Sequence, residues 1–117
     1  MKSHKDLHVW QKSIEFVTIL YRITKIFPKE ELYGLISQIR RAGISIPSNI
    51  AEGAARNYKK EFIQYLYVGL GSASELETQL IISRNLNYIS PEKYDSLLSD
   101  LTEIRIMLLG LIKSLKK

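Results

Sequence analysis

Few side chains in this sequence of 117 residues are suited to catalysis or to metal binding. There is no cysteine, and the two histidines, His4 and His8, both lie near the start of the chain. Histidines four residues apart can chelate a metal ion on one face of a helix, but no third ligand accompanies this pair. The sequence also lacks a Ser-His-Asp pattern and a glycine-rich phosphate loop that follows a strand. We therefore expect a protein that is not an enzyme and that has no metal and no cofactor.

Basic residues around an aromatic side chain form the first candidate binding site. Arg56, Lys59 and Lys60 surround Tyr58, and further arginines lie a few helical turns earlier. Cations interleaved with an aromatic ring can hold phosphates and stack a base. A charged turn between two helices of a soluble bundle has the same composition, so a structural role stays open. The predicted nucleic-acid-binding residues are Arg40, Arg41, Arg56, Lys59 and Lys60.

A second candidate is a polar face on the helix predicted over residues 29–56. Its members follow one another at steps of four and three residues, which places them on one side of the helix. This face is either a groove that meets an anion or a partner, or a hydrogen-bonded network that fixes the register of helices or subunits. We favour the network. The face consists of Arg41, Ser45, Ser48, Glu52 and Arg56.

A run of small residues at 69–74 is the counterpart of this face on the next predicted helix. Glycine costs about 1 kcal/mol relative to alanine inside a helix, so we expect the run to let another helix pack closely, with Ala73 in the seam. Glu75 and Gln79 follow four residues apart and could meet Arg41 or Ser48. These residues are therefore candidates for packing between helices or subunits.

The net charge of +5 is distributed unevenly. Residues 1–60 contain 11 Lys and Arg against 5 Asp and Glu, whereas residues 61–117 contain 6 against 7. A basic half beside a nearly neutral half suggests an anionic partner, although solubility alone can explain such an imbalance. No apolar run is long enough for a membrane span and no signal peptide is recognisable. A cytoplasmic protein without a membrane partner is the expectation.

Apolar residues repeat at steps of four and three, a mean of 3.5, in four segments. We predict an all-α, antiparallel up-down-up-down four-helix bundle that forms a single domain over residues 1–117. Pro47 should kink the second helix without ending it, because Gly43 lies where the proline ring needs room. The expected caps are Asp6, Asn57 and Ser90, with Asn87 left-handed. The predicted helices span residues 7–27, 29–56, 58–86 and 91–115.

The first predicted helix carries two apolar stripes. One contains Trp10, Ile14, Val17 and Tyr21, and the other contains Phe16, Leu20, Ile23 and Phe27. Two stripes exceed what the core of a single bundle needs. The second stripe, with Phe16 and Leu20 at its centre, therefore predicts contact between subunits.

Two internal motifs and the opening of the chain are distinctive. They are residues 39–42 (IRRA), residues 45–53 (SIPSNIAEG), residues 71–80 (GSASELETQL), and Asp6, Leu7 and Trp10. From about Asp6 to Ile112 the chain resembles the four-helix bundle proteins encoded by intervening sequences in bacterial 23S ribosomal RNA genes. That family is similar to the accessory variability proteins of diversity-generating retroelements, which are basic pentamers that bind nucleic acid and associate with a reverse transcriptase. The resemblance implies a ring-like homo-oligomer, a pentamer.

Two functions of different classes follow from the sequence. The leading hypothesis is an oligomeric bundle that binds nucleic acid weakly and with little sequence specificity, with RNA as the first choice and DNA left open. Assembly of five chains would raise the charge from +5 to about +25 and make a weak patch multivalent. The alternative is a scaffold that docks a protein partner without nucleic acid.

Overall fold

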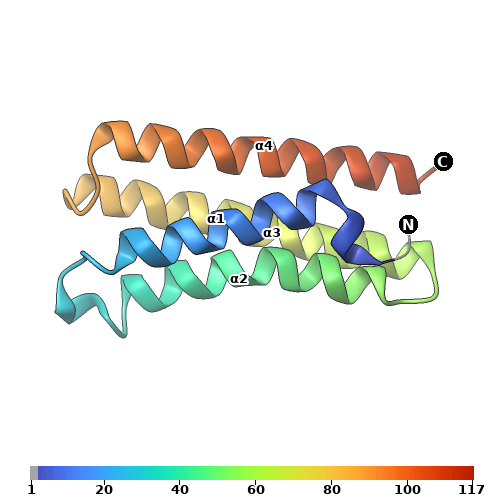
Figure 1. The fold of residues 1–117 in the computed structure, drawn as a ribbon, viewed down its shortest axis with the longest axis horizontal. Coiled ribbons are helices and arrows are strands. Elements are labelled where there is room, and N and C mark those ends of the chain that lie inside the picture. The colour runs from blue at the N-terminus through green and yellow to red at the C-terminus, as the bar shows by residue number, and fades with distance from the viewer. Residues whose placement is uncertain (1–2) are drawn as a thin grey trace.

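Four long helices make up most of residues 3–117, the part of the chain that the computed structural model describes. They pack side by side in an antiparallel bundle with extents of 44 × 24 × 20 Å (Figure 1). This confirms the predicted all-α, up-down-up-down architecture. Two short 3₁₀ helices precede α1 and α2. The elements are η1 (His4–Asp6), α1 (His8–Thr24), η2 (Lys29–Glu31), α2 (Leu35–Ala54), α3 (Lys59–Asn85) and α4 (Pro91–Leu115).

The core contains the apolar seams that the sequence pattern predicts. On α4, Leu101, Ile104 and Leu108 are fully buried, and on α3, Leu66 and Leu76 are equally inaccessible. Each such side chain contributes about 1.5–3 kcal/mol when it is removed from water. Burial of apolar side chains along one face of every helix therefore holds the bundle together.

The structure corrects the interpretation of the two stripes on α1. Phe16 and Leu20 are only 2% and 1% exposed, and Ile23 and Phe27 are also buried against the other helices of the same chain. This stripe is the core face of α1 and offers no free surface to a second subunit. The predicted contact between subunits through Phe16 and Leu20 is therefore wrong. The stripe that includes Ile14 is the outer one, because Ile14 is 40% exposed.

Some helix boundaries also differ from the prediction. The second helix starts at Leu35 and not at residue 29, because residues 29–31 form η2 and a turn follows. Glu31 stabilises this start, since its Oε1 accepts a hydrogen bond of 3.2 Å from the N–H of Leu35. The first helix ends at Thr24, before the predicted residue 27. The Thr24 hydroxyl there accepts a hydrogen bond from a side chain of α2.

Two of the predicted caps are wrong and two are confirmed. Asp6 lies within η1, where its carboxylate accepts from the N–H of Ser3, and α1 begins without a side-chain cap. The N-cap of α3 is Tyr58 and not Asn57. Ser90 caps α4 as predicted, with its Oγ accepting from the N–H of Lys93 at 3.1 Å. Asn87 is left-handed as predicted, with φ of 62°.

The helix α2 continues unbroken through Pro47, as predicted; the bend at this residue stays a prediction. Proline has no N–H, so the carbonyl of Gly43 receives no hydrogen bond from it. Gly43 has a second role, because a Cβ at this position would lie 2.7 Å from Cδ1 of Leu20 on α1. Gly43 therefore brings α1 and α2 close together.

The contact between α2 and α3 depends on small residues. A Cβ on Gly53 would lie 2.8 Å from Cβ of Tyr65 and 3.2 Å from the carbonyl oxygen of Phe62. Further along the same contact, Ser45 Oγ and Ser72 Oγ form a hydrogen bond of 2.7 Å. Ala73 is fully buried, which agrees with its predicted place in the seam. These two helices consequently approach each other closely along much of their length.

We predict that Gly53→Ala lowers the free energy of unfolding by about 1–3 kcal/mol, because the added methyl group meets backbone and Cβ atoms of α3 that cannot rotate away. Gly110→Ala is the matched control, since a Cβ there has no neighbour within 4 Å. The control should gain up to about 1 kcal/mol from its better helix propensity. Urea denaturation of both variants measures the difference. Equal stabilities would contradict the close α2–α3 contact.

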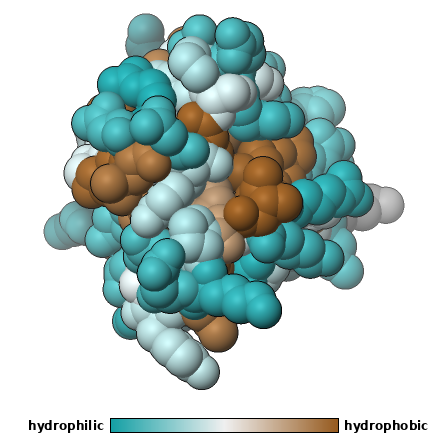
Figure 2. All heavy atoms as spheres, turned by 90° about the vertical axis from the view of Figure 1, so that its left-hand side faces the viewer, coloured by the Kyte–Doolittle hydropathy of each residue, from teal (hydrophilic) through white to brown (hydrophobic). Residues whose placement is uncertain are grey.

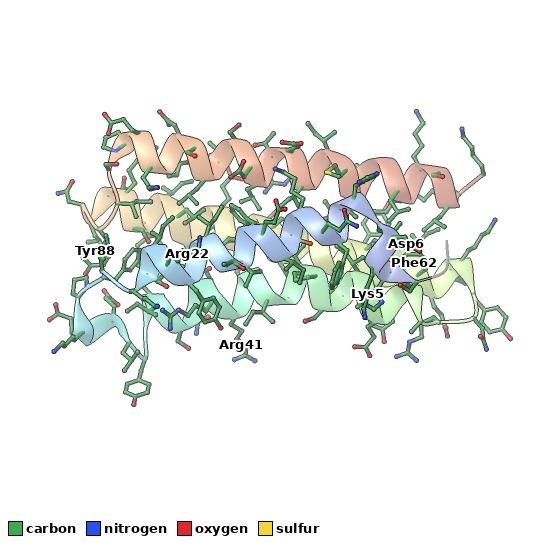
Figure 3. The ribbon with its side chains drawn as sticks, viewed as in Figure 1. Lys5, Asp6, Arg22, Arg41, Phe62 and Tyr88 are labelled. Carbon is green, nitrogen blue, oxygen red and sulfur yellow. The ribbon has the colours of Figure 1, made fainter. Side chains whose placement is uncertain are left out.

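The loops at one end of the bundle are joined by a hydrogen bond between Tyr88 and Glu31. The Tyr88 hydroxyl, in the α3–α4 loop, donates to Glu31 Oε2 at 2.9 Å, and the Tyr88 ring lies 5.2 Å from the ring of Phe27. Figure 3 shows Tyr88 at this end of the molecule. The hydrogen bond to Glu31, followed by burial, raises the pKa of Tyr88 above its ordinary value. The two loops therefore stabilise each other as long as Tyr88 keeps its proton.

We expect Tyr88→Phe to lower the thermal unfolding midpoint at neutral pH, because Glu31 loses a hydrogen bond. A tyrosine with a raised pKa stabilises the fold fully below its ordinary pKa of about 10 and loses that contribution as pH rises through the folded-state value. The difference between wild type and variant should therefore shrink above about pH 10. A difference that stayed constant across that range would show that this hydrogen bond adds nothing.

Candidate nucleic-acid interface

Three exposed cations lie together at the turn between α2 and α3. Arg56 follows the end of α2, and Lys59 and Lys60 open α3. Neither lysine forms an ion pair with any residue in the described part of the chain. The ring of Tyr58 is 68% exposed between them. The structure thus places Arg56, Lys59 and Lys60 at one exposed turn, with Tyr58 between them in the sequence.

Arg56 is held in place by two partners. Its Nη2 lies 3.2 Å from Oε1 of Glu52 and also donates to the hydroxyl of Tyr65. Its guanidinium carbon lies 5.0 Å from the centre of the Tyr65 ring. Tyr65, more than Glu52, raises the pKa of Arg56 above its ordinary value. An arginine is protonated in proteins in any case, and these contacts give the guanidinium a fixed direction.

A shallow hollow adjoins this cation. It has a volume of about 360 Å³ and is lined by Arg56, Glu61, Gln64, Tyr65 and Val68. The lining combines an aromatic ring, an amide and a guanidinium, the groups that stack on a base and bind its edge. Glu61 is the one acid of the lining. A single base and its phosphate match this chemistry.

Arg40 lies elsewhere and has a different environment. Its Nε donates to Thr24 Oγ1 at 2.9 Å and its Nη2 donates to the carbonyl of Tyr21 at 3.3 Å. The guanidinium also lies over the Tyr21 ring, 4.4 Å from its centre. Sixteen residues along a helix correspond to roughly 24 Å, so Arg40 is far from Arg56. The structure does not join Arg40 to the basic turn.

The predicted polar network is present only in part. Ser45 bonds to Ser72, and Asn49 Nδ2 donates to the carbonyl and the Oγ of Ser45 at 2.7 and 2.9 Å. Arg41 and Ser48 are exposed, and their side chains make no hydrogen bond within the described residues. Figure 3 shows Arg41 pointing away from the bundle. Within one chain the face therefore forms two separate groups, Ser45 with Asn49 and Ser72, and Glu52 with Arg56, and not one continuous network.

The two polar residues predicted to reach this face from α3 behave differently. Glu75 is exposed and has no partner in the described part of the chain. Gln79 is only 8% exposed, and its Oε1 has no hydrogen-bond partner there. Neither forms a hydrogen bond or ion pair with Arg41 or Ser48. A side-chain contact between α2 and α3 is instead made by Ser72, which belongs to the run of small residues predicted to pack closely, although its hydrogen bond to Ser45 was not predicted.

Several other charged residues are neutralised within the chain. Lys12 lies 3.6 Å from Asp100 and 3.3 Å from Glu103, which ties α1 to α4. Arg105 bonds to Glu77 at 3.1 Å. These pairs neutralise both cations on the surfaces where they lie. The basic turn between α2 and α3 is therefore more available to an anion than the face formed by α1 and α4.

The described residues can also be compared with the requirements of a metal site and of a membrane-spanning helix. The ring of His4 packs edge-on against Trp10 at 5.1 Å. Within residues 3–117 no group of three or more His, Cys, Asp or Glu side chains is arranged to hold a metal ion. No helix in that part of the chain has the length and apolar character needed to span a membrane.

The fold and the exposed basic turn define an all-α four-helix bundle protein. The family described as 23S rRNA-intervening sequence protein matches residues 5–110, and the chain belongs to this family. A similar solved structure is that of a protein of unknown function from the S23 ribosomal protein family of Bacteroides thetaiotaomicron. It has a TM-score of 0.80 and 32% sequence identity, and the match covers 90% of this chain and 98% of that one. No curated protein matches the chain.

Proposed function

We propose that this protein is a non-enzymatic, oligomeric bundle that binds nucleic acid, RNA rather than DNA, through its phosphates and with little sequence specificity. The observation that carries the proposal is the exposed turn between α2 and α3. There Arg56, Lys59 and Lys60 flank the exposed Tyr58 in the sequence, and two of the three cations have no acidic partner among the described residues. The family description, which refers to 23S rRNA, supports the choice of RNA.

The basic residues favour nonspecific binding to the phosphates of a nucleic acid over recognition of its base sequence. Lysines on flexible stems contact phosphates as point charges, and such contacts position a protein without reading the bases. Tyr58 and the Tyr65 hollow could each stack a base, an interaction that tolerates every base. Three cations per chain bind weakly alone. Multivalency in an assembly would raise the affinity without any new contact.

The proposed assembly uses the outer face of α2 and α3, defined here as Arg41, Ser48, Gly71 and Glu75. All four residues are exposed, and a Cβ at Gly71 would have nothing within 4 Å. An exposed glycine inside a helix costs about 1 kcal/mol, and no contact of Gly71 among residues 3–117 offsets this cost. Contact with another copy would offset it. A pentamer is the stoichiometry that the family resemblance implies.

We predict a steep fall of affinity for a labelled single-stranded RNA as salt is raised, because each neutralised phosphate releases counterions. The triple variant Arg56→Ala, Lys59→Ala, Lys60→Ala should bind more weakly, and its salt slope should be flatter by about 0.7 for each phosphate that it no longer neutralises. Fluorescence anisotropy over a salt series measures both quantities, with a duplex DNA of equal length for comparison.

The control for this experiment removes three exposed cations at the other end of the bundle, namely Arg22, Lys29 and Lys93. It has the same charge change and should retain most of the binding. If the control loses binding and the first variant does not, the site lies at the other end. If a correctly assembled protein binds neither nucleic acid at low salt, the proposal fails, and the protein-interaction scaffold takes its place.

We expect light scattering at micromolar concentration to give an oligomer, with a mass of about 68 kDa for a pentamer of 13.5 kDa chains. Arg41→Ala should loosen the assembly, because Arg41 projects from the proposed contact face without a partner in the described part of its own chain. Arg22→Ala, an exposed arginine on α1, is the matched control. A mass near 13.5 kDa would contradict assembly, whereas a dimer or tetramer would contradict only the pentamer.

A further inference from the structure

A second hollow lies at the end of the bundle opposite the basic turn. It occupies about 330 Å³ where the connection between α1 and α2 folds over the first turns of α2. This volume is at the small end of the range for ligand pockets, roughly 300–1,000 Å³. Figure 2 faces this end and shows hydrophobic areas among hydrophilic side chains. None of the residues of this hollow belongs to the proposed nucleic-acid interface, because Arg40, which the sequence had assigned to that interface, lies here.

The inner lining of the hollow is apolar. Phe27 and Ile36 are buried at 5% exposure each, and Leu32 is 48% exposed beside them. Two further apolar side chains lie on the same connection, Ile26 at 78% and Tyr33 at 92% exposure. Such exposure leaves an apolar surface that an aliphatic or aromatic group would cover favourably.

The remaining lining residues include three cations and no acid. Lys25 and Lys29 are exposed, and Arg40 is half-buried. None of the three forms an ion pair with any described residue. Glu31, on the same connection, is engaged by the Tyr88 hydroxyl and the N–H of Leu35. Glu30 is also on this connection and is exposed, but neither acid lines the hollow, so the lining itself carries three cations and no acid.

Arg40 lines the hollow and is held in place by contacts with α1. Its Nε and Nη2 donate to Thr24 Oγ1 and to the carbonyl of Tyr21, both uncharged partners. The Tyr21 ring lies against the guanidinium plane at 4.4 Å. The Nη1 atom makes no hydrogen bond within the described residues. A guanidinium fixed in this way donates to a carboxylate with little loss of side-chain freedom.

We propose that this hollow binds a small carboxylic acid with an apolar tail. The tail packs against Phe27, Leu32 and Ile36, and the carboxylate lies among Lys25, Lys29 and Arg40. The apolar lining of the hollow matches the tail of such a ligand, and the unpaired cations match its carboxylate. A simple anion would leave the apolar lining exposed, and a neutral apolar molecule would leave the cations without a partner.

Isothermal titration calorimetry with octanoate tests the proposal on the full chain. Octanoate should bind at a stoichiometry of one per chain, more tightly than 1-octanol, which lacks the charge, and than acetate, which lacks the tail. The double variant Lys25→Gln, Lys29→Gln should bind octanoate roughly fivefold more weakly or worse, because two exposed ammonium groups no longer attract the carboxylate. Lys93→Gln, an exposed lysine outside the hollow, should bind as the wild type does.

Leu32→Glu places a negative charge inside the hollow and should abolish octanoate binding. Leu86→Glu is its matched control, because Leu86 is 50% exposed against 48% for Leu32 and does not line the hollow. Circular dichroism checks that both variants keep their helices. The proposal is overturned if the folded wild type does not bind octanoate at millimolar concentration, or if 1-octanol binds as tightly. It is equally overturned if Leu32→Glu changes the mass of the assembly and leaves octanoate affinity unchanged, since the hollow would then be a subunit contact.

Discussion

The close approach of α2 and α3 is the constraint on which the rest of the molecule depends. Gly53 has no side chain at the point where α3 turns back along α2, and the Ser45–Ser72 hydrogen bond lies further along the same contact. Small residues let the two backbones come together, and this directs the larger apolar side chains of both helices toward α1 and α4. It also fixes the direction of the turn between the helices. The basic cluster is exposed because the glycine contact brings α3 back directly after Arg56.

Periodicity predicted the architecture well, because burial along one face of each helix is the main source of stability. It could not say which of two apolar stripes on α1 is internal. Both stripes have the correct spacing, and only the positions of the other three helices assign Phe16 to the core and Ile14 to the surface. The error at the start of α2 has a different cause. Helix propensity over residues 29–34 is adequate, but tertiary contacts of Glu31 and Phe27 at this end favour a short 3₁₀ turn.

For the candidate sites, too, the sequence indicates which chain neighbours lie together but not which contacts the fold creates. Residues adjacent in sequence, such as Lys59 and Lys60, were found because their proximity follows from the chain itself. The partners that orient the arginines were not, since Tyr65 and Thr24 come from other elements and only the fold brings them near Arg56 and Arg40. Arg40 shows the consequence most clearly. Its neighbour in sequence, Arg41, points away from the bundle, so two adjacent cations have unrelated surroundings.

An even number of antiparallel helices places η1 and the last turn of α4 at the same end of the molecule as the turn between α2 and α3 (Figure 1). At this end Lys116 Nζ also donates to the hydroxyl of Tyr67. An affinity tag or fluorescent label joined to η1 or to the end of α4 would therefore lie at the same end of the bundle as Arg56, Lys59 and Lys60. A polyhistidine sequence in particular would add ligands for anions and metals to that surface. A label carried by the α1–α2 connection or by the loop before α4 would leave the basic end of the bundle unaltered.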